Sequence, residues 1–128
     1  MPPTPLSRLR ALCLALPEAR EVEAWGSPTF RVKTMFATYA GPGEHGSDRP
    51  SAWVKSDKTT QELLVELAPD RFFVPPYVGV KGWIGVYLDD SVTDWEEFGD
   101  LLADAWRMSA PKKLVAEYDA KARPAAPD

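Results

Sequence analysis

The sequence is poor in the residues that form covalent or metal cross-links. Its 128 residues include one cysteine and one histidine. Cys13 therefore has no partner for an internal disulfide, and one cysteine with one histidine cannot supply the four ligands of a structural zinc site. We interpret Cys13 as a small core residue on the apolar face of a helix. We expect the protein to contain no metal and no cofactor.

The chain also lacks a long apolar run and an excess of positive charge. No stretch approaches the ~20 consecutive apolar residues of a membrane helix, and residues 1–16 do not have the layout of a targeting signal. The 15 basic and 19 acidic side chains give a net charge of -4. This balance excludes a wholly basic nucleic-acid coat but not a small basic patch. We expect a soluble, cytoplasmic protein that does not bind membranes.

The composition is sufficient for one folded domain. A content of 45% hydrophobic and 11% aromatic residues is typical of a globular chain, and 128 residues match one domain. We place the domain at residues 4–119 and interpret residues 120–128, which include the segment KARPAAPD, as a disordered tail.

Apolar spacing, proline positions and capping patterns divide the domain into helices and strands. We expect helices at residues 5–16, 60–68, 94–108 and 111–118. Strands are expected at residues 22–25, 29–33, 35–40, 51–56, 72–74 and 82–88. In the second helix, Thr59 and Glu62 match a capping box, and the leucines at 63, 64 and 67 form the expected inward face. Short connections favour an antiparallel sheet with helices on one face, a two-layer α+β fold.

Strand alternation sorts side chains between the two faces of this sheet. One face is apolar and would support the helices: Phe30, Val32, Val54, Ile84, Val86 and Leu88. The opposite face combines cations and aromatic rings: Arg31, Lys33, Trp53, Lys55, Trp83 and Tyr87. The loop at residues 75–82 would add Tyr77 and Lys81 to that face. The result is a basic and aromatic surface on an acidic protein.

Three interpretations of this surface remain open. Cations and flat rings suit DNA or RNA, with Arg31, Lys33 and Lys55 on phosphates and the tryptophans stacking on bases. Alternatively, the loop at residues 75–83 and Trp25 would shape a pocket for a peptide or an anionic small molecule. The face could instead join two copies in a homodimeric, chaperone-like domain, so the chain is expected to be a monomer or a homodimer. Because no nucleophile, base and orienting group can be assembled, we expect a binding module and not an enzyme.

An acidic cluster precedes and opens the third expected helix. Carboxylates can hold Mg²⁺ or Ca²⁺, but acidic residues at a helix N-terminus are also favoured by the helix dipole, which is the interpretation we adopt. The cluster consists of Asp89, Asp90, Asp94, Glu96 and Glu97.

Several ordered stretches resemble the MmcQ/YjbR-like family, small bacterial domains of uncertain function. The matching stretches are residues 12–18 (LCLALPE), 25–32 (WGSPTFRV), 35–37 (MFA), 71–79 (RFFVPPYVG), 81–86 (KGWIGV), 105–107 (AWR) and 110–114 (APKKL). The resemblance spans about residues 8–119. It implies a secretion-chaperone or frataxin-like α+β fold of helix, three strands, helix, two strands and helix. Family members are often described as DNA-binding by fold analogy, and the resemblance transfers no catalytic residue.

Overall fold

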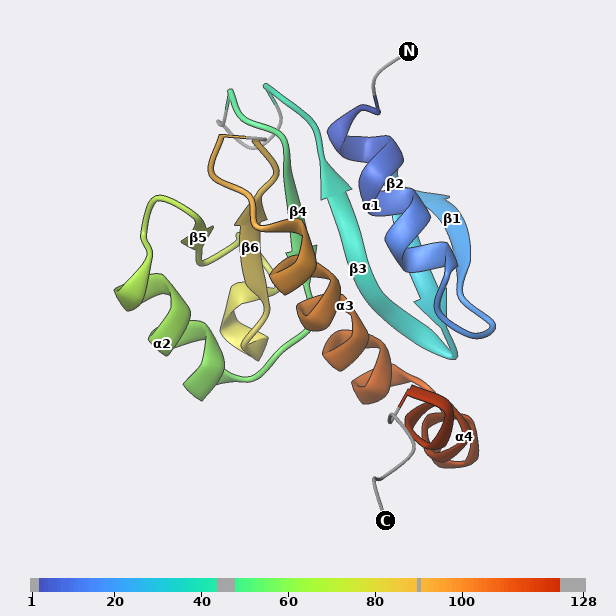
Figure 1. The fold of residues 1–128 in the computed structure, drawn as a ribbon. Helices are drawn as coiled ribbons and strands as arrows, with labels where there is room; N and C mark the ends of the chain where they lie inside the picture. Colours follow the sequence, from blue (N-terminus) through green and yellow to red (C-terminus); the bar gives the residue numbers. More distant parts are fainter. Residues whose placement is uncertain (1–2, 44–47, 90, 123–128) are drawn as a thin grey trace.

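A single six-stranded antiparallel sheet organises the protein. The computed structural model describes residues 3–43, 48–89 and 91–122, and the strand order in the sheet is β1-β2-β3-β4-β6-β5. The strands are β1 (Arg20–Ala24), β2 (Ser27–Val32), β3 (Thr34–Ala40), β4 (Ser51–Val54), β5 (Phe72–Phe73) and β6 (Ile84–Tyr87). The helices are α1 (Pro5–Leu14), α2 (Lys58–Leu67), α3 (Trp95–Ser109) and α4 (Lys112–Ala122). Figure 1 shows α1 and α3 lying across one face of the sheet.

This architecture confirms the α+β prediction, with an antiparallel sheet and helices on one face. It differs in detail from the order that the family resemblance implies, because four strands precede α2 where three were expected. The additional strand is β1, which pairs with β2 through a two-residue turn at Trp25 and Gly26. None of the helices in the described part of the chain has the length and apolar character that crossing a membrane requires.

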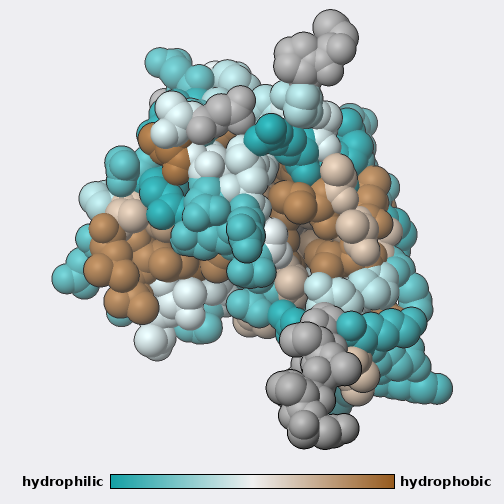
Figure 2. Space-filling model, in the orientation of Figure 1, coloured by the Kyte–Doolittle hydropathy of each residue, from teal (hydrophilic) through white to brown (hydrophobic). Residues whose placement is uncertain are grey.

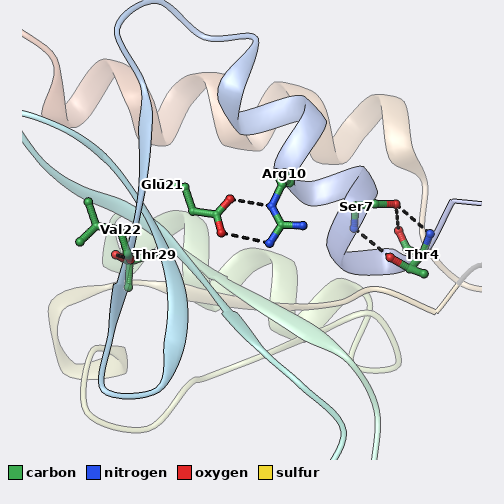
Figure 3. A network of polar contacts seen from close by, with 6 residues as sticks. All are labelled: Thr4, Ser7, Arg10, Glu21, Val22 and Thr29. Atoms are coloured by element: carbon green, nitrogen blue, oxygen red, sulfur yellow. Dashed lines mark hydrogen bonds and ion pairs between the residues drawn. The ribbon is translucent and has the colours of Figure 1, made fainter.

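Helix α1 begins after the N-cap residue Thr4 and is tied to the sheet edge. The Thr4 hydroxyl accepts a hydrogen bond from the Ser7 amide, and Pro5 occupies the first turn. Further along the helix, the Arg10 guanidinium forms two hydrogen bonds with the Glu21 carboxylate on β1, at 2.6 and 3.0 Å (Figure 3). Cys13 is fully buried, and this burial raises the pKa of its thiol. The thiol therefore stays protonated and serves as core, as the sequence indicates.

The main core lies between the sheet and the helices. All six residues predicted for the apolar sheet face are buried in it: Phe30, Val32, Val54, Ile84, Val86 and Leu88. From α3, Phe98, Leu102 and Trp106 pack against them. The Trp106 indole N–H also donates to the Pro17 carbonyl at 3.0 Å, which satisfies its polar atom inside the core.

A bulge in β3 changes which residues face the helices. The pairing of β2 with β3 shifts register between Phe30 and Arg31. As a result, the consecutive residues Phe36 and Ala37 both lie in the main core, whereas Met35 packs on the other side of the sheet.

Helix α2 differs from its prediction in both its start and its inward face. It is capped by Asp57, whose carboxylate accepts from the Thr60 amide at 2.8 Å, so the Thr59 capping box is wrong. The helix begins two residues earlier than expected and turns Gln61 inward, where it is buried. Leu63 and Leu67 are instead 54% and 70% exposed, and Figure 2 shows apolar surface over α2.

The C-terminal boundary also moves. Helix α4 continues to Ala122, so residues 120–122 are helical and belong to the fold. The rest of the predicted tail, residues 123–128, lies outside the described residues.

Candidate ligand-binding cavity

A second, smaller apolar cluster lies on the face of the sheet that the helices leave free. It consists of Ala40, Trp53 and Trp83, with Met35, Phe73 and Val78 packed around them. Trp53 stands directly opposite Gly85, which in turn stands opposite Phe73. A Cβ atom on Gly85 would come within 2.3 Å of the Phe73 ring, so the glycine makes room for that ring. We call this group the outer cluster.

The loop at residues 74–83 covers part of the outer cluster and is anchored from below. The buried Gln61 amide donates to the Gly79 carbonyl at 2.8 Å and to the Trp83 carbonyl at 2.7 Å. At the end of the loop, Gly82 has φ +96, and a Cβ there would lie 2.7 Å from the backbone of Asp57 and Lys58. The loop is therefore held tightly against the start of α2 by a glycine that no other residue can replace without strain.

The outer face contains a cavity of about 610 Å³. Its floor is the surface of strands β2, β3 and β4, one wall is the β1–β2 turn, and the other is the loop at residues 74–83. The lining residues are Ala24, Trp25, Ser27, Thr29, Met35, Thr38, Tyr39, Ala40, Trp53, Tyr77, Val78 and Lys81. Most of this lining is apolar or aromatic, and the remaining polar groups are mainly hydroxyls.

Two aromatic residues border the cavity from opposite walls. Both side chains are large and partly apolar, yet Trp25 is 87% exposed and Tyr77 is 77% exposed. Their backbone φ angles are +53 and +64, in the left-handed region that bulky residues rarely adopt. The fold therefore holds two exposed aromatic residues at this cavity in unfavourable backbone conformations.

Lysine provides the charge at the cavity. Lys81 lines the cavity. Among the described lining residues it is the sole cation, and none of them is a carboxylate. Lys55 follows the end of β4, and its ammonium donates to the hydroxyls of Ser109, at 3.0 Å, and Thr34, at 3.4 Å. Burial, and to a smaller extent the charge of Lys81, lower the pKa of Lys55.

The structure brings together only some of the predicted site residues. Trp53, Tyr77 and Lys81 line the cavity, and Trp83 packs beside Trp53 in the outer cluster. Lys55 is not among the lining residues, and its ammonium reaches Ser109 on α3. Trp53 and Trp83 are 8% and 5% exposed, so the expected open surface of stacking tryptophans is wrong. The loop at residues 74–83 and Met35 pack against the two indole rings, which strand alternation alone would leave exposed to solvent.

The other three predicted residues are not among the residues that line the cavity. Arg31 contacts the lining, since its guanidinium donates to the hydroxyl of the lining residue Thr29 at 3.2 Å. Lys33 is exposed in the β2–β3 turn. Tyr87 packs against Phe73 with ring centroids 4.7 Å apart, and the Arg49 guanidinium lies 3.6 Å from its ring centroid.

Comparison with known proteins places the chain in a family. The family model described as YjbR matches residues 14–108. The chain belongs to the YjbR family. No curated protein matches the chain. The crystal structure of Deinococcus radiodurans protein DR2400, which carries a DUF419 domain, is similar with a TM-score of 0.70 and 24% identity. The match covers 94% of this chain and 92% of that one, and at this identity it concerns the fold.

Sequence reasoning missed the residues that position the cavity in this YjbR domain. Gln61 gave no signal beyond a polar residue in an amphipathic helix, and the inward rotation of α2 explains its role. Met35 and Thr38 lie on β3, where the bulge at Phe36 reverses the simple alternation. Trp25 was predicted as the last residue of a strand, whereas in the structure it forms a turn with Gly26. The alternative prediction of a pocket shaped by Trp25 and the loop at residues 75–83 agrees with the cavity, which both line.

The acidic cluster of the YjbR domain serves helix α3. The Asp94 carboxylate accepts from the Glu97 amide at 3.1 Å, and Glu97 itself pairs with Arg71 at 3.1 Å. Asp89 forms an ion pair with Arg49, and Asp90 lies outside the described residues. Within the described ranges, no group of three or more histidine, cysteine or acidic residues is arranged to hold a metal ion.

Proposed function

We propose that this YjbR domain binds a small aromatic or apolar molecule in the outer-face cavity. The observation that carries the proposal is a mostly apolar cavity of about 610 Å³ bordered by two exposed aromatic residues. This volume falls within the roughly 300–1,000 Å³ of small-molecule sites, which are also lined mainly by apolar and aromatic groups with a few polar ones.

The backbone at Trp25 supports a binding role for this side chain. Residues Trp25 and Gly26 form a two-residue hairpin turn in which both φ angles are positive, +53 and +77. Turns of this kind favour Asn-Gly because asparagine and glycine adopt positive φ at low cost. A tryptophan costs about 1–3 kcal/mol in a sparsely populated conformation. Hairpin stability does not explain Trp25, whereas contact between its ring and a ligand does.

The same features favour a small molecule over nucleic acid and binding over catalysis. The two tryptophans that would stack on bases are covered, and the chain carries a net charge of -4. Among the described residues that line the cavity, none is a carboxylate, imidazole or thiol that could activate a hydroxyl. Lys81 and Tyr77 remain as groups that orient a bound molecule.

Replacement of Trp25 by asparagine tests the proposal. The probe is N-phenyl-1-naphthylamine, a neutral aromatic dye whose fluorescence rises in an apolar site. We expect saturable binding to the wild-type protein and at least about fivefold weaker binding to Trp25→Asn, the loss typical of a side chain that matters for binding. The melting temperature of Trp25→Asn should be equal to or higher than that of the wild type, since asparagine suits the turn.

Lys33→Asn is the matched control. Lys33 is also exposed at a positive φ, +50, but it does not line the cavity. Its substitution should leave dye binding unchanged. Absence of saturable dye binding, or equal binding by Trp25→Asn, would refute the proposal. Titration of labelled single- and double-stranded DNA at low salt provides the competing arm: tight DNA binding without dye binding would favour the nucleic-acid interpretation.

A further inference from the structure

The cavity on the outer face is long and narrow. Met35 and Ala40 both line it and lie near opposite ends of β3, and the strand between them is about 16 Å long. Spread over this length, the volume of about 610 Å³ gives a mean width of about 7 Å. The space is therefore about twice as long as it is wide.

The two exposed aromatic residues belong to segments at opposite ends of this space. The turn with Trp25 lies at the Ala40 end, because β2 runs antiparallel to β3 and begins at that turn. The loop at residues 74–83, which bears Tyr77, leads into the start of β6. The start of β6 pairs with the end of β4, which points towards the Met35 end of β3. A ligand that contacts both aromatic residues must therefore extend along the cavity.

The threonine hydroxyls of the cavity floor are already hydrogen-bonded within the protein. The Thr29 hydroxyl donates to the Val22 carbonyl, as Figure 3 shows for these two residues, and it accepts from Arg31. The Thr38 hydroxyl donates to the Pro28 carbonyl at 3.0 Å. Because a hydroxyl has one proton to donate, neither threonine can donate to a ligand while these bonds are kept.

This floor favours a hydrocarbon chain over an extended peptide. The strands beneath the cavity, β2, β3 and β4, each have a neighbour on both sides, so their backbone groups are paired within the sheet. A peptide lying on this face would bring a row of backbone N–H and C=O groups that lack such partners, and an unpaired polar group is costly to desolvate. A hydrocarbon chain needs no hydrogen bonds and gains with each methylene that it buries.

We infer that the ligand carries one extended alkyl chain, which lies lengthwise over β3 between the turn at Trp25 and the loop at residues 74–83. An extended chain advances about 1.25 Å per carbon, given bonds of about 1.5 Å at tetrahedral angles. The cavity therefore accommodates about 12–14 carbons. This inference rests on the proposed function and adds the shape and chemical class of the ligand.

A series of neutral straight-chain alcohols tests the inference. The probes are 1-octanol, 1-decanol, 1-dodecanol and 1-tetradecanol, each titrated to displace N-phenyl-1-naphthylamine from the protein. We expect the affinity to rise about fourfold for each added methylene that the cavity buries. The rise should level off at about 12–14 carbons, where the chain fills the cavity. Partition of the alcohols onto an open apolar surface would give a rise without such a limit.

Variants that shorten the cavity from one end should move this limit. Ala24 is half-buried and lines the cavity beside Trp25, and Ser27 lines it on the adjacent strand. Ala24→Leu should shorten the limit by about two carbons, the length that leucine adds beyond the β-carbon. It should weaken 1-tetradecanol by at least about fivefold and leave 1-octanol unchanged. Ser27→Leu, at the same end, provides a second test should Ala24→Leu fail to fold.

Two control variants lie outside the cavity lining. Ala116→Leu makes the same substitution at an exposed position of α4 and should not move the limit. Leu67→Gln, on the exposed apolar face of α2, should also bind the series normally, which excludes binding to that surface.

The source of the chain is distinguished by its head group. Dodecanoic acid and a lysophosphatidylcholine with the same chain are compared below the concentrations at which they form micelles. Tighter binding of the acid would identify a free fatty acid as the source, and tighter binding of the lysophosphatidylcholine would identify a membrane lipid. Either result requires a bound alkyl chain and supports the inference.

The outcomes separate this inference from the proposed function. Saturable dye binding that the alcohols do not displace, an affinity that rises through the whole series, or a limit unchanged in folded Ala24→Leu and Ser27→Leu would overturn the alkyl-chain inference and leave the cavity proposal intact. Absence of saturable dye binding would overturn the proposed function as well. A limit that shortens in these variants and not in Ala116→Leu would support the inference.

Discussion

The two faces of the sheet support two apolar clusters that differ in how they are covered. On one face, helices α1 and α3, with residues of α2 and α4, enclose a continuous core. On the other face, one loop covers Trp53 and Trp83 and leaves a cavity of about 610 Å³ beside them. Under the proposed function, this contrast is a division of roles: the helix side holds the main core, and the outer side holds the cavity for the ligand.

Single residues connect the two clusters. In the short strand β5, Phe72 is buried in the main core and its neighbour Phe73 packs in the outer cluster. Gln61 extends from α2, whose apolar residues contact the main core, to the loop over the outer cluster. Substitutions confined to the main core should therefore reduce stability alone. Substitutions of a connecting residue should reduce both stability and dye binding.

The largest effect on stability is expected from the main core. Phe98 is buried on α3 and contacts Trp95 edge to face, with ring centroids 5.8 Å apart. Phe98→Ala should reduce the free energy of unfolding by about 3–5 kcal/mol because it removes apolar contacts and leaves a cavity. Urea denaturation measures the loss. Dye affinity per folded molecule should stay near the wild-type value, and a parallel loss of affinity would contradict the division of roles.

An intermediate effect is expected at Gln61. Gln61→Met keeps the volume but removes the donor that serves the carbonyls of Gly79 and Trp83. The Trp83 carbonyl would lose its donor, whereas the Gly79 carbonyl keeps the hydrogen bond from the Gly82 amide. An unpaired buried acceptor should cost about 1–3 kcal/mol. Because the loop that bears Tyr77 and Lys81 is then less firmly held, neutral-dye affinity should fall more than in Phe98→Ala. A variant that is less stable but binds the dye normally would show that the loop does not depend on this anchor.

The smallest effect is expected from the surface ion pair between Arg10 and Glu21. The hydrogen bond from Arg10 lowers the pKa of the Glu21 carboxyl in the folded protein. A lowered pKa means that the stabilisation is present above the ordinary carboxyl pKa and is lost as the pH falls through the folded value. Glu21→Gln should therefore cost about 0.2–1 kcal/mol at pH 7.

Unfolding measured at several pH values checks this sign. The difference between wild type and Glu21→Gln should shrink as the pH falls below the ordinary glutamate pKa of about 4.3 and through the lower pKa of the folded protein, where the carboxylate becomes protonated. Dye binding should not change, since the pair joins α1 to β1 outside the cavity lining. A difference that grows on acidification would contradict the assignment.

Much of the fold follows from local signals in the sequence. The six residues predicted for the helix-facing side of the sheet are all in the main core, because period-two alternation is strong in strands with one buried face. The cap at Thr4 and the core face of α3 were also predictable. The prediction for α2 was wrong because Asp57 and Thr59 are both plausible caps. The helix begins two residues earlier than predicted, and Gln61 lies on its buried face.

The site was predictable only in part, for a physical reason. Alternation placed Trp53 and Trp83 on the same side, and they share the outer cluster. Whether their rings are open depends on the loop at residues 74–83, whose position is determined by Gln61 and Gly82, distant contacts that no local pattern encodes. Lys55 likewise follows the end of β4, where alternation no longer determines the direction of its side chain, and its ammonium reaches Ser109 on α3.

The strand order has a consequence for self-association. The two outermost strands, β1 and β5, present the only backbone edges of the described sheet. The first carries the charged residues Arg20, Glu21 and Glu23, and the second has two residues and is followed by Pro75 and Pro76. Charges and prolines at such edges disfavour addition of a foreign strand. Two copies of this protein that associate would therefore do so through side-chain surfaces and not by extending one sheet into the next.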